Sequence, residues 1–193
     1  MKQNFAKIIS TLCHPLLTIP LYIAFVMFAF EDIKKASYIS SLIIGGVFVP
    51  LVLWMFFKSR NGSYTNFDVS DRKQRKSLFV FIIPILIIVT IILYKTQQSG
   101  TLLISFLFAL ILVSVSQVVN LKVKSSLHVS LNIFLSFLIM PMNYTIGLIV
   151  LSMTILIGWS RVVLGRHTVK EVLTGGGIGL AISLIMYYTE MKF

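Results

Sequence analysis

The stretch that decides the fold is SLFVFIIPILIIVTIILY, Ser77 to Tyr94, which contains no Asp, Glu, Lys or Arg. Such a run approaches the roughly 20 apolar residues that cross a bilayer as one helix. Four more runs without charge are of similar length: Leu12 to Phe30, Tyr38 to Phe57, Thr101 to Leu121 and Val172 to Thr189. A longer run, Val129 to Ser160, is interrupted by the turn signal Pro141-Met142-Asn143, which predicts two short helices. The sequence therefore predicts an all-α, polytopic membrane helix bundle with about seven (six to seven) transmembrane helices.

The composition supports this class. Hydrophobic residues make up 57% of the 193 residues and charged residues 12%, whereas a soluble domain has about twice that charged fraction. The first run is too long for a secretory signal, and no small-residue cleavage site follows before Glu31-Asp32, so it is expected to stay as the first helix. Because no linker or polar appendage interrupts the pattern, residues 1–193 are expected to form one integral-membrane domain.

The distribution of positive charge predicts the orientation. When the spans are counted alternately, one side of the membrane carries only four of the 17 Lys and Arg residues, namely Lys34, Lys35, Lys95 and Lys192. The positive-inside rule places the other side, with thirteen, in the cytoplasm, and the membrane would be the cell (inner) membrane. The net charge of +11 is explained by loops beside anionic headgroups. The expected partner is therefore the lipid bilayer and not a nucleic acid.

The chemistry is concentrated in SRVVLGRHTVKE, Ser160 to Glu171, at a predicted membrane boundary. If a helix begins near His167, Glu171 lies one turn further on the same face. A carboxylate there can hold the imidazole in one tautomer, and Arg161 can hold an anion. Two other polar clusters are predicted on the same side, each before a helix: Asp71 to Lys76, and Lys124 to His128. Basic residues at helix N-termini favour anion binding.

At these residues the chain resembles the type 2 phosphatidic acid phosphatase superfamily, the integral-membrane lipid phosphate phosphatases. That family has a motif Ser-Arg-x5-His-x3-Asp, which Ser160, Arg161, His167 and Glu171 match with Glu in place of Asp. Its Pro-Ser-Gly-His-like motif is matched in part by Ser126 and His128. The Lys/Arg-containing motif is matched loosely by the cluster Arg72 to Lys76. The resemblance runs from about residue 71 to residue 179.

The resemblance implies a role for each matched residue. His167 would attack phosphorus and form a phosphohistidine, Glu171 would orient it, and His128 would protonate the leaving oxygen. Cationic side chains would neutralise the phosphoryl oxygens and two serines would add hydrogen bonds; these phosphate-binding residues are Arg161, Arg72, Arg75, Lys124, Ser126 and Ser160. No metal and no cofactor is implied. The substrate would be a membrane lipid phosphate or diphosphate: phosphatidic acid, phosphatidylglycerol phosphate and polyprenyl diphosphates all fit.

Other residues have simpler interpretations. The segment Lys58 to Lys76 is expected to be a solvated, headgroup-binding loop, and a specific phosphate role for Arg72 or Arg75 stays open. His14 is expected to have a packing role. Gly175 and Gly179 have the Gly-x3-Gly spacing that is typical of closely packed membrane helices.

Two other functions remain open from the sequence. The departures from the family motifs, Glu171 for Asp and Leu127 for Gly, allow a catalytically degenerate lipid-binding or transport protein of the same fold. Alternatively, Asp68 and Asp71, three residues apart, would serve as ligands in a metal-dependent phosphotransferase.

Overall fold

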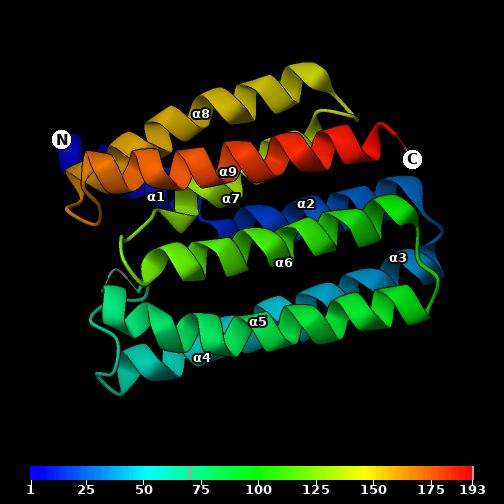
Figure 1. The fold of residues 1–193 in the computed structure, drawn as a ribbon, viewed down its shortest axis with the longest axis horizontal. Coiled ribbons are helices and arrows are strands. Elements are labelled where there is room, and N and C mark those ends of the chain that lie inside the picture. The colour runs from blue at the N-terminus through cyan, green and yellow to red at the C-terminus, as the bar shows by residue number, and fades with distance from the viewer. Residues whose placement is uncertain (70, 193) are drawn as a thin grey trace. The chain divides into compact units, whose positions relative to one another are not determined.

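The computed structural model describes residues 1–69 and 71–192, and in these ranges it contains no β-strand. The helices are α1 (Lys2–Leu12), α2 (Pro15–Phe30), α3 (Ile33–Ser40), the π-helix η1 (Ser41–Phe48), α4 (Val49–Arg60), α5 (Arg72–Lys95), α6 (Gly100–Asn120), α7 (Leu127–Ile139), α8 (Tyr144–Val163) and α9 (Val169–Glu190). Figure 1 labels the α-helices. They form two compact units. One contains Met1–Pro15 and Gln98–Phe193, and the other contains Leu16–Gln97. The single domain expected from the sequence stays a prediction.

Among the described residues, six segments are long and apolar enough to cross a membrane: Lys2–Phe30, Ile33–Arg60, and the helices α5, α6, α8 and α9. The protein is therefore an all-α polytopic membrane protein, as the uncharged runs predict. The predicted break at Pro141 is confirmed, because α7 ends at Ile139 and α8 begins at Tyr144.

The expectation that two short helices flank this break is only half right. α8 has 20 residues and is long enough to span the membrane. α7 has 13 residues, which gives a rise of about 20 Å against the roughly 30 Å of a hydrocarbon core. In the part of the chain that the structure describes, α7 is thus a shorter apolar helix beside the six long apolar segments.

In the unit Leu16–Gln97, most of the described residues in the connection between α4 and α5 are exposed, as the sequence predicts, but two of its apolar side chains are packed. Tyr64 and Val69 are buried in a cluster with Met55. The Tyr64 hydroxyl lies 2.7 Å from the Ser77 hydroxyl, and it accepts a hydrogen bond from the indole N–H of Trp54 at 3.2 Å. These contacts fix the connection against both neighbouring helices.

In the other unit, α7 is the buried helix, and most of its residues from His128 to Phe137 are inaccessible. α7 and α9 run in the same direction with their first turns side by side, because the Ser126 backbone N–H donates to the Glu171 carbonyl at 3.1 Å. α6 runs the other way along α9, since Ser105 donates to the Glu190 carboxylate at 3.2 Å. In Figure 1, α8 (yellow) and α9 (orange to red) run side by side, and α7 lies behind α9. The end of α8 and the starts of α7 and α9 therefore meet at one end of the unit.

The Gly-x3-Gly pair brings α7 and α9 together, as predicted. A Cβ atom at Gly175 would lie 2.5 Å from the Ser126 carbonyl oxygen, and one at Gly179 would lie 2.8 Å from the Ser130 Cα atom. Both clashes are with backbone, which cannot rotate away. Only glycine allows the two helices to approach this closely.

Replacing Gly175 with alanine is expected to lower the free energy of unfolding by about 1–3 kcal/mol, the usual cost of overpacking. The matched control is Gly177→Ala on the same helix, where an added Cβ meets nothing within 4 Å. That variant should be as stable as the wild type or slightly more stable, because alanine favours helix over glycine. Thermal unfolding in detergent measures both. Equal loss of stability in the two variants would contradict the close α7–α9 contact.

Candidate functional site

The connection from α8 to α9 is built by a helix C-cap in which Arg161 takes part. The Arg161 carbonyl accepts hydrogen bonds from the backbone N–H groups of Arg166 at 2.9 Å and His167 at 3.2 Å, while Gly165 N–H donates to Val162 at 3.0 Å. The bonds from Arg166 and Gly165 are the two bonds of a Schellman motif, which needs a left-handed residue after the helix. Gly165 has φ +65° and supplies it. The residues between Arg161 and His167 are therefore those that end α8 and form its C-cap turn.

A substitution at Gly165 tests this turn. No atom lies within 4 Å of a Cβ placed there, so Gly165→Ala introduces only left-handed backbone strain and should cost about 1–2 kcal/mol of stability. Gly165→Asn should recover part of the loss, because asparagine tolerates this conformation better than alanine. Thermal unfolding of the two variants in detergent is the measurement. An alanine variant as stable as the asparagine variant would contradict the assigned backbone geometry.

The next residues start α9 through a capping box. Thr168 is the N-cap: its hydroxyl accepts from Glu171 N–H at 3.3 Å, and the Glu171 carboxylate accepts from Thr168 N–H at 3.2 Å. The helix begins at Val169, close to His167 as the sequence predicts. The pattern Thr-x-x-Glu indicates a helix start, and it is the sequence signal that locates the first residue of α9.

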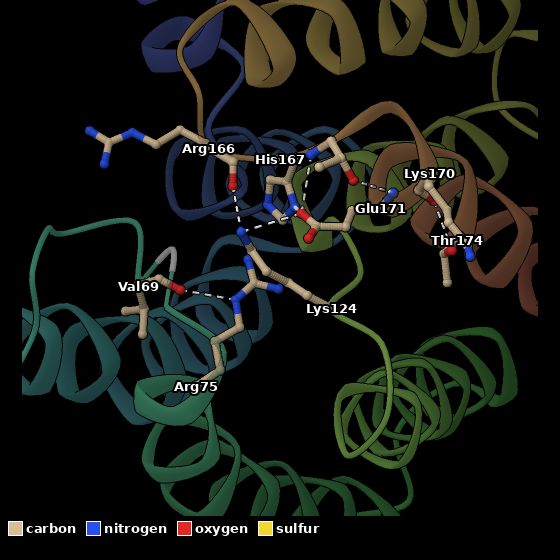
Figure 2. A network of polar contacts seen from close by, with 9 residues as sticks. Val69, Arg75, Lys124, Arg166, His167, Lys170, Glu171 and Thr174 are labelled. Atoms are coloured by element: carbon tan, nitrogen blue, oxygen red, sulfur yellow. Dashed lines mark hydrogen bonds and ion pairs between the residues drawn. The ribbon is translucent and has the colours of Figure 1, made fainter.

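Glu171 also contacts the histidine, as the spacing predicts. Its Oε2 atom lies 3.0 Å from His167 Nδ1, and the His167 side chain is fully buried. The same oxygen lies 3.3 Å from Lys124 Nζ (Figure 2). One carboxylate oxygen thus meets an imidazole, an ammonium group and a backbone N–H. Hydrogen bonds of this charge-assisted kind hold a carboxylate firmly in place.

Lys124 approaches this pair from the segment before α7. Its ammonium group donates to the Arg166 carbonyl at 2.6 Å in addition to pairing with Glu171. The sequence predicted a phosphate ligand at this position. In the structure Lys124 ties the start of α7 to the connection between α8 and α9, so it positions Glu171 and His167; direct phosphate binding by Lys124 stays a prediction.

Arg161 and Ser160 end α8 inside the bundle, and neither has exposed surface. The Arg161 NH1 group donates to the Ser10 hydroxyl of α1 at 2.6 Å. The Ser160 hydroxyl donates to the Ile157 carbonyl of its own helix at 2.7 Å. Its proton would have to leave that carbonyl before Ser160 could donate to phosphate, and phosphate binding by Ser160 stays a prediction.

The start of α7 supplies the second group of predicted residues. Ser126, the N-cap residue, is fully buried, and its Oγ atom makes no hydrogen bond within the described part of the chain. His128 is 5% exposed and lies one residue into the helix. The N-terminus of α7 points its positive end at this region, and α9 begins beside it. A buried hydroxyl at two adjacent helix N-termini is a suitable environment for an anion.

The arginines of the first motif belong to the other compact unit. Arg72 is exposed at the first position of α5, whereas Arg75 is 2% exposed and donates through Nε to the Val69 carbonyl at 2.9 Å (Figure 2). Val69 has φ +48°, a strained conformation for a branched residue. Arg75 therefore supports a strained turn, and a phosphate-binding part for both arginines stays a prediction.

Asp71, proposed in the metal-dependent alternative, has a structural role. It is the N-cap of α5, and its Oδ1 atom accepts from the backbone N–H groups of Lys73 at 2.8 Å and Gln74 at 3.0 Å. This bonding explains the presence of an aspartate here without a metal ion.

The end of the unit formed by residues 1–15 and 98–192 thus gathers His167, Glu171, Lys124, Arg161, His128 and Ser126. Comparison of the chain with family models, curated proteins and solved structures gave no match in any of the three. The arrangement itself defines the class of site: a buried imidazole with a carboxylate partner, beside cationic groups and two helix N-termini, in a polytopic membrane protein.

Proposed function

We propose that this protein is a metal-independent phosphatase that removes phosphate from a membrane lipid phosphate or diphosphate through a phosphohistidine intermediate. The observation that supports it most is the 3.0 Å contact between His167 Nδ1 and the Glu171 carboxylate. With the Nδ1 proton directed at Glu171, the other ring nitrogen, Nε2, carries the lone pair that a nucleophile needs. Arg161, which precedes His167 in the same motif, is buried, so water weakens its charge little.

In the first step, Nε2 of His167 forms a bond to phosphorus while the bond from phosphorus to the leaving oxygen breaks. His128, in its protonated form, gives its proton to that oxygen. Glu171 stabilises the positive charge that develops on His167. Arg161 and the Ser126 hydroxyl bind the phosphoryl oxygens, and the helix N-termini add their partial positive charge.

In the second step, water attacks phosphorus and the phosphorus–nitrogen bond breaks. His128, now neutral, accepts the proton from the water, so inorganic phosphate leaves and both histidines return to their starting forms. The proton that His128 donates in the first step is thus replaced in the second step by a proton from water. The only other reactant consumed is one water molecule.

A lipid substrate suits the surroundings of this site. Its residues lie at the ends of apolar helices, where a headgroup could reach them while its tail stays in the bilayer. The excess of Lys and Arg on the loops of this side favours the cytoplasmic face of the cell (inner) membrane. Phosphatidic acid, phosphatidylglycerol phosphate and polyprenyl diphosphates are the substrates to compare.

A second candidate, a protein that binds lipid phosphate without turnover, is favoured by one observation. The Lys124 ammonium lies 3.3 Å from the Glu171 carboxylate and offsets the charge that would polarise His167. In such a protein the same cationic end would hold the headgroup, and His167 would act only as a hydrogen-bond partner.

The test is phosphate release by the purified protein in detergent with excess EDTA, over a panel of the three lipid classes. Membranes prepared without the protein set the background. Release that persists in EDTA supports the phosphatase, and the preferred lipid identifies the substrate. Release that EDTA abolishes would favour the Asp68/Asp71 alternative. Binding of a lipid phosphate without release, by folded protein, would favour the second candidate.

A further inference from the structure

The N-terminal helix α1 lies outside the part of the chain that resembles the phosphatases, yet it contacts the candidate site. Ser10 accepts the hydrogen bond from Arg161. The turn that follows α1 contacts the start of α7: the Cys13 carbonyl accepts from the Asn132 side chain at 3.1 Å. The His14 ring also lies edge-on to the His128 ring, with centroids 4.5 Å apart. All of these residues belong to one compact unit.

We propose that Ser10 is a positioning residue for Arg161, and that α1 is in this way a working part of the phosphate site. The inference rests on the proposed function. It assigns to the first helix a role that goes beyond membrane anchoring: α1 holds the arginine of the Ser-Arg-x5-His motif in the orientation that receives phosphate.

The geometry of the contact supports this role. The Arg161 NH1 group and the Ser10 Oγ atom are 2.6 Å apart, and the two residues are 0% and 6% exposed. A hydrogen bond from a charged donor in a buried setting is stronger than one at a surface. It also fixes one end of a long side chain with many rotamers, so binding phosphate no longer has to order that side chain.

Independent contacts keep α1 in place for this task. The Asn132 amide donates both to the Cys13 carbonyl and, at 2.7 Å, to the His128 carbonyl, so a single side chain joins the turn after α1 to the first turn of α7. At the other end of α1, the Phe5 ring lies 6.0 Å from the Trp159 ring of α8. Ser10 is therefore held between two attachment points and is well placed to orient Arg161.

A purely structural role for α1 makes a different prediction. If Ser10 only filled space, its removal would lower stability and the amount of folded protein, while the folded fraction would bind phosphate as before. If it positions Arg161, the folded fraction itself should bind phosphate more weakly. Affinity for inorganic phosphate, measured as competitive inhibition of lipid phosphate hydrolysis, separates the two.

The experiment compares Ser10→Ala and Ser10→Cys, which remove the hydroxyl, with Ser10→Thr, which keeps it. Thr11→Ala is the matched control, because it removes an exposed hydroxyl from the next position of the same helix. Variants are compared at equal amounts of folded, monodisperse protein. Ser10→Cys preserves the side-chain size, so it keeps the test valid if the alanine variant does not fold.

The expected result is a rise on the order of ten-fold in both KM and the inhibition constant of inorganic phosphate for the Ala and Cys variants. kcat should change less, and Ser10→Thr should recover most of the affinity. An active wild type with unchanged phosphate affinity in Ser10→Ala and Ser10→Cys would overturn this inference alone. A folded wild type that neither releases nor binds phosphate would overturn the proposed function and this inference together.

Discussion

Replacing His167 with alanine is expected to abolish phosphate release, with a fall in kcat on the order of 10⁴-fold or more, as for other covalent nucleophiles. The 3.0 Å contact of His167 with the Glu171 carboxylate depends on the backbone turn that Gly165 and Arg161 form. The measurement is phosphate release from the preferred lipid in detergent, in the presence of EDTA. The fold should persist, because the α9 capping box does not involve the His167 side chain.

The matched control is Lys170→Ala. Lys170 is exposed on the first turn of α9, close in sequence to His167, and no contact described above depends on its charge. This variant should retain kcat within a few-fold. Equal losses in Lys170→Ala and His167→Ala would point to a general effect of disturbing this end of the bundle and would contradict a nucleophilic role.

The intermediate gives a second measurement for the same prediction. Rapid quenching of the wild type with labelled lipid phosphate should trap a phosphoprotein that is stable in alkali and labile in acid, as expected for phosphohistidine. His128→Ala should slow its hydrolysis by about 10²–10⁴-fold, the usual contribution of general acid–base catalysis. The label should be absent from His167→Ala. Label that persists in His167→Ala would assign the nucleophile to another residue.

The fold class follows directly from the sequence because the bilayer requires long runs without charge. The features that the sequence does not predict are those that depend on tertiary packing. α7 is short because α8 and α9 bury it, and a buried helix does not need the length of a lipid-exposed one. α1 contains Lys2 and Lys7, so most of it lies before the first uncharged run. In the structure this segment is nevertheless helical up to Leu12, just before α2 begins. Tyr64 and Val69 anchor an otherwise mostly exposed connection between α4 and α5, and their packing against Met55 depends on the tertiary structure.

The candidate site also has one contact that the sequence predicts and others that depend on tertiary packing. The contact between His167 and Glu171 is local, so their spacing predicts it. The partner of Arg161 cannot be predicted, because Ser10 is 151 residues away and one serine in a helix carries no motif. The sequence predicts that Lys124 binds phosphate, because it is a cation just before the second motif. Its contacts with Glu171 and Arg166 depend instead on how α7 packs beside α9.

Replacing Glu171 with glutamine should separate its two roles. Glutamine can still accept the hydrogen bond from Thr168 N–H and complete the capping box, so the only expected loss of stability is about 1 kcal/mol from the weaker contact with Lys124. The carboxylate charge that stabilises the positive charge developing on His167 is lost, and kcat should fall by on the order of 10²–10⁴-fold. Phosphate release and thermal unfolding, measured on the same preparations, test both statements.

Alanine and aspartate at the same position complete the test. Glu171→Ala removes the cap as well as the charge, so it should lose the activity that glutamine loses and about 0.5–2 kcal/mol of stability in addition. Glu171→Asp keeps the charge on a side chain one methylene shorter, which must then reach His167, Lys124 and Thr168 from further away. Its kcat should lie between those of the wild type and Glu171→Gln. If Glu171→Gln retained full activity, the carboxylate would be only a helix cap, and the phosphohistidine mechanism would lose the contact on which it rests.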